Sequence, residues 1–202
     1  MAKPPNPELA DRIVQLALAE LADKPPEAVN MRSLAAKAGV SPTAIYYYFA
    51  SKEALFERIK FETLGELEAT IGRVLEGAAG ASGRDKLAAL CRAFVAFSLS
   101  RPHLAGLLME ELPPRLDLDE EAMERYYRIH DQARSLVVEA LADGSMEGPR
   151  DPDLEASVGQ AALWGLVAQF KAKRVHPRFW NDIDPLVERF LELFLGGKGV
   201  SQ

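Results

Sequence analysis

Apolar residues recur at intervals of three and four positions along almost the whole chain. That spacing gathers them on one side of an α-helix, whereas the strict alternation expected of strands is scarce, so the pattern predicts an all-α chain of about nine helices without a sheet. Asn6 and Pro7 fit the N-cap and the first residue of the first helix, and Ser51 fits the cap of a long one. We expect the first helix to end before Lys24. The further helices are expected over Met31–Ala38, Pro42–Phe49, Lys52–Glu76, Arg84–Ser100, Pro102–Leu112 and Asp119–Ala142, then from a cap at Asp153 onward, and finally over Asp182–Leu195.

The size and composition of the chain indicate a protein with a real core and no membrane partner. It has 202 residues, of which 48% are apolar, but its longest apolar runs fall far short of the ~20 residues that cross a bilayer. The N-terminus lacks the apolar stretch of a signal peptide, so we expect a cytoplasmic location. The single cysteine, Cys91, shares an apolar stripe with Leu87 and Phe94, which favours a buried thiol.

The segment from Leu34 to Ile45 has the pattern of a helix-turn-helix. Ala35 is small enough for a second helix to approach, and Gly39 can adopt the left-handed conformation that ends the first helix. Ile45 lies six residues beyond the glycine and is expected to be the buried anchor of the second helix. Ser41 is expected to be the N-cap of that helix, and Pro42 its first residue.

Three consecutive tyrosines, Tyr46, Tyr47 and Tyr48, follow this anchor. Successive side chains on a helix point about 100° apart, so three in a row cannot all face one core. Ile45 and Phe49 already occupy the inward face, and we expect most of the tyrosine surface to be exposed. Exposed tyrosines on this helix could contact phosphates and thymine methyl groups in a major groove. The alternative is that Tyr46 or Tyr48 packs against the neighbouring helices.

Together these elements resemble the DNA-binding head of TetR-family regulators, which share Gly-Val-Ser, Leu/Ile-Tyr-x-His/Tyr-Phe and Ser-Lys-Glu-x-Leu in this order. The resemblance covers about fifty residues, and the three motifs correspond here to residues 39–41, 45–49 and 51–55. It implies a DNA-binding domain at residues 1–51 and a helical body at residues 52–202 that dimerises and binds a small-molecule effector. By position it implies DNA contacts at Arg32, Ser41, Pro42, Thr43, Ala44, Tyr46, Tyr47, Tyr48 and Lys52. Pro42 departs from the family pattern, which often has Lys or Arg there, and this removes one phosphate contact.

Two segments of the body are candidates for a dimer interface. Residues 157–170 are apolar or small almost all round, and such a helix is buried on more than one side. The last helix, Asp182–Leu195, carries an apolar stripe wider than one core needs. We expect the two to form a four-helix seam across a two-fold axis, as the resemblance also implies. The alternative is that both fill the core of one monomer.

An effector pocket would combine apolar walls with a few polar groups. The candidate lining residues in the body are Phe94, Phe97, Ser98, His103, Met109, Tyr127, His130 and Trp164. The three histidines lie on separate segments without ligand spacing, and the glycines of residues 77–83 follow no strand, so we expect neither a metal ion nor a bound nucleotide as a cofactor.

The sequence shows neither a nucleophile paired with a base nor a cofactor-binding motif, so nothing in it indicates an enzyme. The net charge of −6 is unusual for a DNA-binding protein, but residues 1–60 carry eight basic and seven acidic side chains, or +1, which leaves −7 for the rest. We expect a repressor that binds a palindromic DNA operator and is released by a small-molecule effector. The alternative function is a helical adaptor that uses the same surface for protein contacts.

Overall fold

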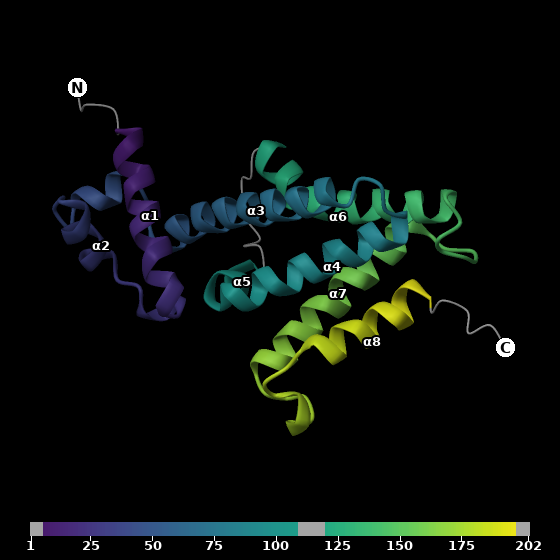
Figure 1. The fold of residues 1–202 in the computed structure, drawn as a ribbon. Helices are drawn as coiled ribbons and strands as arrows, with labels where there is room; N and C mark the ends of the chain where they lie inside the picture. The colour runs from purple at the N-terminus through teal and green to yellow at the C-terminus, as the bar shows by residue number, and fades with distance from the viewer. Residues whose placement is uncertain (1–5, 109–119, 197–202) are drawn as a thin grey trace. The chain divides into compact units, whose positions relative to one another are not determined.

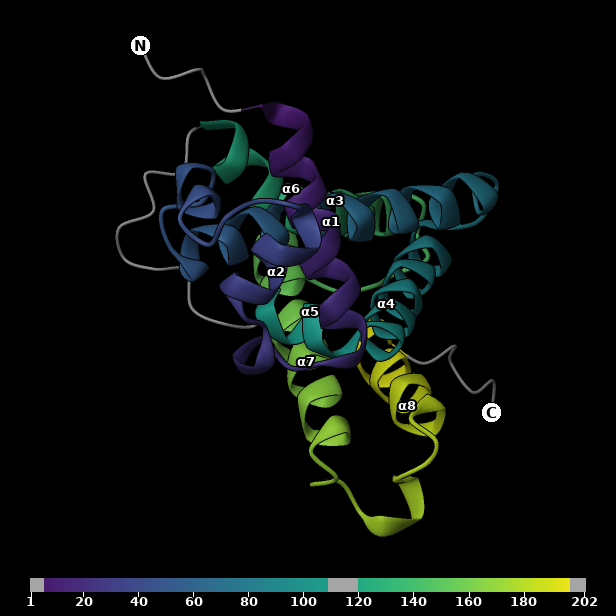
Figure 2. The same cartoon turned by 90° about the vertical axis from the view of Figure 1, so that its left-hand side faces the viewer.

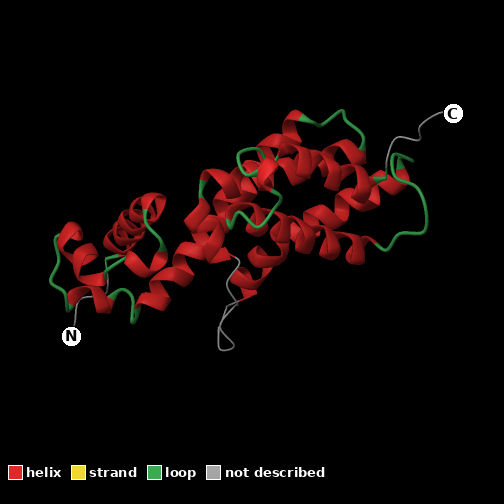
Figure 3. Cartoon of the chain, turned by 90° about the horizontal axis from the view of Figure 1, so that it is seen from below, coloured by secondary structure: helices red, strands yellow, loops and turns green. Residues whose placement is uncertain are grey.

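The computed structural model describes residues 6–108 and 120–196 as helices joined by loops, with no strand in these two ranges (Figure 3). The all-α prediction is confirmed. Figure 1 shows the elements in chain order, which are α1 (Pro7–Asp23), η1 (Pro26–Ala28), α2 (Met31–Ala38), η2 (Ala44–Tyr47), α3 (Lys52–Gly77), α4 (Gly83–Ser100), α5 (Pro102–Leu108), α6 (Glu120–Ala142), α7 (Pro152–Lys171), η3 (Pro177–Phe179) and α8 (Asp184–Leu195), the η elements being 3-10 turns.

The chain divides into two compact units. Unit 1 comprises Met1–Glu66 and Ser100–Leu118, and unit 2 comprises Leu67–Leu99 and Asp119–Gln202. Helix α3 contributes residues to both units, and α5 belongs to unit 1 although it follows α4 in the sequence. The division between a DNA-binding domain at residues 1–51 and a body at residues 52–202 concerns function and stays a prediction.

Unit 1 is built around the apolar faces of its helices. Ile13, Leu34, Ile45, Leu55 and Ile59 are all fully buried in one cluster, which shows that α1, α2, η2 and the start of α3 share a core. Helix α1 contacts both α2 and α5, and two leucines of α5 complete the cluster. The burial of Ile45 in this core therefore holds η2 against α2.

The ends of the helices are set by local hydrogen bonds. Asn6 Oδ1 accepts from the Glu8 amide at 3.1 Å, and Ser51 Oγ accepts from the Ala54 amide at 3.1 Å, so both predicted caps are confirmed. The prediction that Asp153 caps α7 is wrong. Asp151 is the cap, because its Oδ1 accepts from the amides of Asp153 and Leu154 and the helix begins at Pro152, a favoured first residue.

Unit 2 contains a buried stripe on α4 that runs through Leu87, Cys91, Phe94 and Ser98. Burial raises the pKa of the Cys91 thiol to about 12, which makes it an inert core residue as predicted. Helix α6 packs along α7, and Figure 2 shows α7 and α8 side by side with the loop of residues 172–183 between them.

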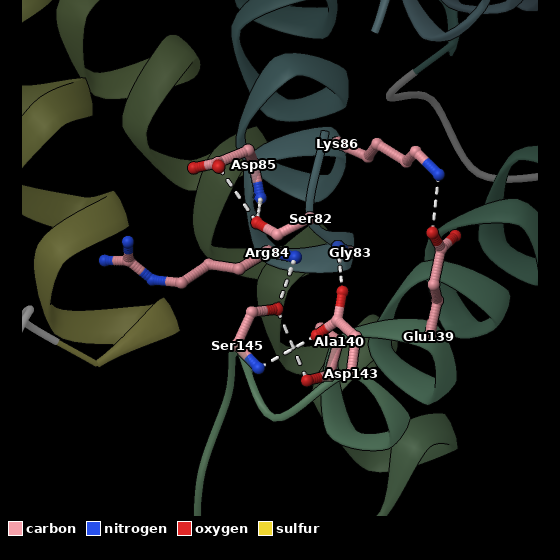
Figure 4. A network of polar contacts seen from close by, with 9 residues as sticks. All are labelled: Ser82, Gly83, Arg84, Asp85, Lys86, Glu139, Ala140, Asp143 and Ser145. Carbon is pink, nitrogen blue, oxygen red and sulfur yellow. Dashed lines mark hydrogen bonds and ion pairs between the residues drawn. The ribbon is translucent and has the colours of Figure 1, made fainter. Parts of the chain in front are cut away.

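The start of α4 is joined to the end of α6 by a polar network (Figure 4). Asp143 Oδ2 accepts from the Gly83 amide at 2.7 Å, and Ser145 Oγ accepts from the Arg84 amide at 3.1 Å. These bonds satisfy amides that a helix start leaves without partners. A Cβ atom on Gly83 would lie 2.3 Å from the Ala140 nitrogen, so only glycine allows the two backbones to approach this closely.

Within the described ranges, no helix combines the length and the apolar character needed to cross a bilayer. The same residues contain no cluster of three or more His, Cys, Asp or Glu side chains that could hold a metal ion.

Candidate nucleic-acid interface

The turn between α2 and η2 depends on Gly39. Its φ of 74° is left-handed, and the amides of Gly39 and Val40 donate to the carbonyl oxygens of Ala36 and Ala35 at 3.1 and 2.9 Å. These bonds close the end of α2 as a left-handed glycine normally does. The chain then reverses toward Ile45, which is fully buried in the core of unit 1. The predicted helix-turn-helix anchors, Ala35, Gly39 and Ile45, are confirmed.

The element after this turn is shorter and tighter than the α-helix predicted over Pro42–Phe49, and that prediction is wrong. The structure has a 3-10 turn over Ala44–Tyr47, in which the Tyr46 and Tyr48 amides donate to the carbonyl oxygens three residues earlier, at 3.2 and 3.0 Å. The Ala44 amide donates both to the Ser41 carbonyl oxygen and to Ser41 Oγ, so Ser41 closes the turn that precedes this element. Bulky aromatic and β-branched residues, which propagate an α-helix poorly, follow.

Tyr46 and Tyr47 are exposed as predicted, whereas Tyr48 follows the alternative and packs against the core. Tyr47 is 76% exposed and Tyr46 is 50% exposed, while Tyr48 is half-buried and packs against the core of unit 1. Arg32, Ser41, Pro42 and Thr43 are exposed and Ala44 is half-buried. All nine candidate contact residues therefore belong to unit 1, and those before Tyr48 present a mixed aromatic, hydroxyl and cationic surface.

Lys52 is half-buried and turned back toward its own unit. Its ammonium group donates to the Glu27 carbonyl oxygen at 3.4 Å and lies 5.2 Å from the centre of the Phe56 ring. A cation held over an aromatic face keeps its charge but loses some conformational freedom. A phosphate contact by Lys52 would use an ammonium group that is already positioned.

Sequence reasoning missed a buried carboxylate beside this surface. Glu20 is only 7% exposed, and its oxygens lie 2.6 Å from the Lys37 nitrogen and 3.8 Å from that of Lys24. The ion pair between Glu20 and Lys37 joins α1 to α2, and the single carboxylate offsets one of the two positive charges beside it. The available signal was the position of Glu20 three residues after Ala17, on the inward side of α1.

The candidate effector residues are brought together only in part. Phe94 and Trp164 meet edge to face with ring centres 4.7 Å apart, and Phe97 and Ser98 are buried on the same helix as Phe94. His130 on α6 approaches Ser157 on α7 at 3.1 Å, and Tyr127 is 48% exposed. His103 belongs to unit 1, apart from the others, and Met109 lies outside the described residues.

The hydroxyl of Ser98 is notable within this set. Ser98 is 1% exposed, and its Oγ atom has no hydrogen-bond partner. A buried hydroxyl without a partner costs about 1–3 kcal/mol. A separate cavity of about 440 Å³ in unit 2 is lined by none of the predicted residues, and its walls are Ser82, Arg84, Asp85, Gly144, Ser145, Met146, Glu147, Arg150, Leu195 and Gly196.

Comparison with known proteins agrees with this geometry. Residues 13–59 match the family model described as bacterial regulatory proteins, tetR family. The HTH-type transcriptional repressor KstR2 of Mycolicibacterium smegmatis is 26% identical over 196 residues, which cover 95% of this chain and 91% of that protein.

Solved structures share the fold at low sequence identity. A protein of unknown function from Rhodococcus sp. RHA1 aligns with a TM-score of 0.76 and 24% identity over 93% of each chain. The fatty acid degradation regulator FadR from Bacillus halodurans aligns with a TM-score of 0.68 and 21% identity over 98% of this chain and 99% of that one. RolR in complex with resorcinol aligns with a TM-score of 0.67 and 18% identity over 95% and 89%.

Proposed function

Because residues 13–59 place this chain in the TetR family of bacterial regulatory proteins, we propose that it is a homodimeric repressor that a small-molecule effector releases from a palindromic operator. The observation that carries the proposal is the turn at Gly39, which joins α2 to a short element that exposes Tyr46 and Tyr47. The similarity of this chain to the repressor KstR2 over nearly its whole length supports the same role. The protein would act in the cytoplasm, where its DNA target lies.

In this proposal the candidate contact residues have different roles. Tyr47, at the most exposed position of η2, contacts base edges, while Arg32, Tyr46 and Lys52 contact phosphates and orient the head. Ser41, Pro42, Thr43 and Ala44 lie at the groove-facing start of the element, and Tyr48 contributes its hydroxyl from a partly buried ring. Phosphate contacts supply salt-dependent affinity, and base contacts supply sequence preference.

The test is fluorescence anisotropy with DNA from beside the gene and with a random duplex, each over a range of salt concentrations. We expect Tyr47→Ala to reduce the preference for the specific duplex by a factor of about ten, which corresponds to the ~1–3 kcal/mol carried by a good base contact. Arg12→Ala, at an exposed position of α1, is the control and should leave that preference unchanged. An affinity for both duplexes that does not vary with salt would instead support a protein-binding adaptor.

The dimer is proposed from an exposed face of α7. Leu154 and Val158 are 61% and 52% exposed, and Ala161 and Gly165 follow on the same side of the helix. The opposite side, with Leu163 and Val167, is buried. A helix that is apolar on both sides requires a second cover. A second copy of the chain, related by a two-fold axis, provides one.

Gly165 offers a direct test of the dimer. A Cβ atom there would meet nothing within 4 Å, so Gly165→Leu should leave the monomer folded while its side chain obstructs a partner helix. We expect wild-type protein to sediment as a dimer at micromolar concentration and the variant as a monomer with unchanged helical circular dichroism. Lys24→Leu, at an exposed position of unit 1, is the control. Monomeric wild-type protein would contradict this proposal.

The effector site is proposed around Ser98, Phe94, Phe97, Trp164 and His130 in unit 2. The support is the edge contact between Phe94 and Trp164 and the unpartnered Ser98 hydroxyl, to which an effector could present a hydrogen-bonding atom. The similarity of the fold to RolR, which was solved with the ligand resorcinol, agrees with a small effector.

Trp164 provides the measurement once an inducing compound is found. Trp180→Phe leaves Trp164 as the sole indole, and we expect the compound to change its fluorescence at concentrations that release DNA. Release of DNA with unchanged fluorescence, together with normal induction of Ser98→Ala, would place the site elsewhere.

A further inference from the structure

The charges around α7 are strongly segregated. Residues 156–181 contain four basic side chains (Lys171, Lys173, Arg174 and Arg178) and no acidic one, within a chain of net charge −6. Residues 147–155, at the other end of the helix, contain four acidic side chains and one basic. Part of this arrangement matches the dipole of α7 itself, which favours acids at the N-terminus and bases at the C-terminus.

The exposed face of α7 defines a register for self-pairing. It runs from Leu154 to Ala172, and its centre lies between Ala161 and Gly165, the two small residues that permit close approach of a second helix. In an antiparallel pair about that centre, Ala161 meets Gly165 of the partner subunit. The same register places the C-terminal end of α7 beside the N-terminal end of the partner's helix, where the partner's Asp151 lies about 18 Å from the centre at 1.5 Å per residue. Arg174 follows Lys171, the last residue of α7, by three positions and stays beside that end, because its amide donates to the Gln169 carbonyl oxygen at 2.9 Å.

Charged groups suited to an intersubunit contact are present at both ends. Arg174 is exposed, and Asp151 uses one oxygen to cap α7, while neither makes an ion pair within the residues that the structure describes. Asp153 and Glu155 are already paired with Arg134 and Arg150. Lys173 lies 5.7 Å from the Trp180 ring, so Arg174 and Asp151 are the strongest candidates for an intersubunit contact.

The backbone leaves the helical conformation at the end of α7. Lys173 has a φ of 53°, and the amides of Lys173 and Arg174 donate to the carbonyl oxygens of Phe170 and Gln169. Glycine is the usual residue at such a helix end, and a non-glycine residue there is strained.

We propose that α7 pairs antiparallel with α7 of a second copy, and that Arg174 contacts Asp151 of the partner subunit at each end of the pair. This inference rests on the proposed dimer and adds its register and its electrostatic partner. At a crossing angle of about 20°, the helix axes diverge by roughly 6 Å at this distance from the centre, which an arginine side chain spans. Two-fold symmetry creates the contact twice.

The test measures the dimer dissociation constant of the full chain by sedimentation equilibrium at low and high salt. Arg174→Glu should raise the dimer dissociation constant about tenfold at low salt, because it replaces two attractive contacts between exposed charges by two repulsive ones. The effect should shrink as salt screens the charges. Asp151→Asn removes the charge but keeps a residue that caps helices well. In that background, Arg174→Glu should have a much smaller effect.

Arg73→Glu makes the same charge change at an exposed position of α3 and should leave the constant unchanged. An equal effect of Arg174→Glu in both backgrounds, or no effect in either, overturns the register while the dimer stands. Wild-type protein that remains monomeric at all salt concentrations overturns the dimer and the register together.

Discussion

Replacing Gly39 by alanine tests the backbone conformation on which the candidate DNA-binding surface depends. The added Cβ atom would meet nothing within 4 Å, so steric overlap with neighbours makes no contribution to the change. The remaining effect is the cost of the left-handed conformation for a residue with a side chain, about 1–2 kcal/mol, partly offset by about 0.4–1 kcal/mol from a less flexible unfolded chain. We expect a net loss of about 1 kcal/mol in the free energy of unfolding of unit 1.

Gly106 provides a matched control in the same unit. It lies within helix α5, and a Cβ atom there would also meet nothing within 4 Å. Gly106→Ala should stabilise unit 1 by about 0.5–1 kcal/mol, because alanine favours a helix interior. The same chemical change is therefore expected to act with opposite signs at the two positions. Gly39→Asn should cost less than Gly39→Ala, since asparagine tolerates the left-handed region.

The assay is urea unfolding followed by far-UV circular dichroism. With an unfolding slope of about 1–3 kcal/mol per molar urea, a loss of 1 kcal/mol lowers the midpoint by about 0.3–1 M. Operator affinity measured in parallel should fall for Gly39→Ala and stay unchanged for Gly106→Ala. The reasoning is refuted if both alanine variants raise the midpoint, because Gly39 would then have an ordinary helical conformation.

Three further predictions concern other contacts. Gly83→Ala should destabilise unit 2 by about 1–3 kcal/mol or more in thermal unfolding, since the new methyl group would lie 2.3 Å from the backbone nitrogen of Ala140. Hydrogen bonds from the Gly83 amide and from Ser145 lower the pKa of Asp143 in the folded protein, so the carboxylate stabilises the fold above the usual pKa of an aspartate, and this stabilisation is lost as the pH falls from there through the lowered pKa. Asp143→Asn should therefore flatten the acid side of a plot of stability against pH. Lys52→Ala should weaken binding to specific and random DNA equally and reduce the slope of log affinity against log salt by about one, and a loss confined to the specific duplex would assign Lys52 to base contacts.

The features that could be predicted from the sequence are those determined by neighbouring residues. The Asn6 and Ser51 caps, the left-handed Gly39 and the burial of Ile45 and Cys91 each follow from a short pattern and the period of a helix. For the same reason the family resemblance at residues 39–55 agrees with the match of residues 13–59 to the tetR family model.

The features that could not be predicted depend on competition between close alternatives or on distant contacts. The sequence pattern predicts the cap of α7 at Asp153, whereas the cap is Asp151, because the helix begins at Pro152. The 3-10 geometry of η2 follows no rule within this segment, since Ser41 Oγ accepts from the Ala44 amide in the same way as Ser51 Oγ accepts from the Ala54 amide at the start of the α-helix α3. The pairing of Glu20 with Lys37 joins residues 17 positions apart, and no spacing rule within one helix reveals it.

The shortness of η2 limits how much sequence information one subunit can extract from DNA. Four residues at about 2 Å of rise each extend over roughly 8 Å, which is the length of two to three base pairs. A site that short recurs by chance about every 16 to 64 base pairs, whereas a bacterial chromosome offers on the order of a million or more competing positions. Two heads that act together square the average spacing between chance matches, which still falls short of the number of competing positions. The rest of the sequence preference must then come from the shape and bendability of the duplex. In the proposed dimer the contact between subunits therefore contributes to operator recognition, because a lone subunit would occupy random DNA almost as readily as its operator.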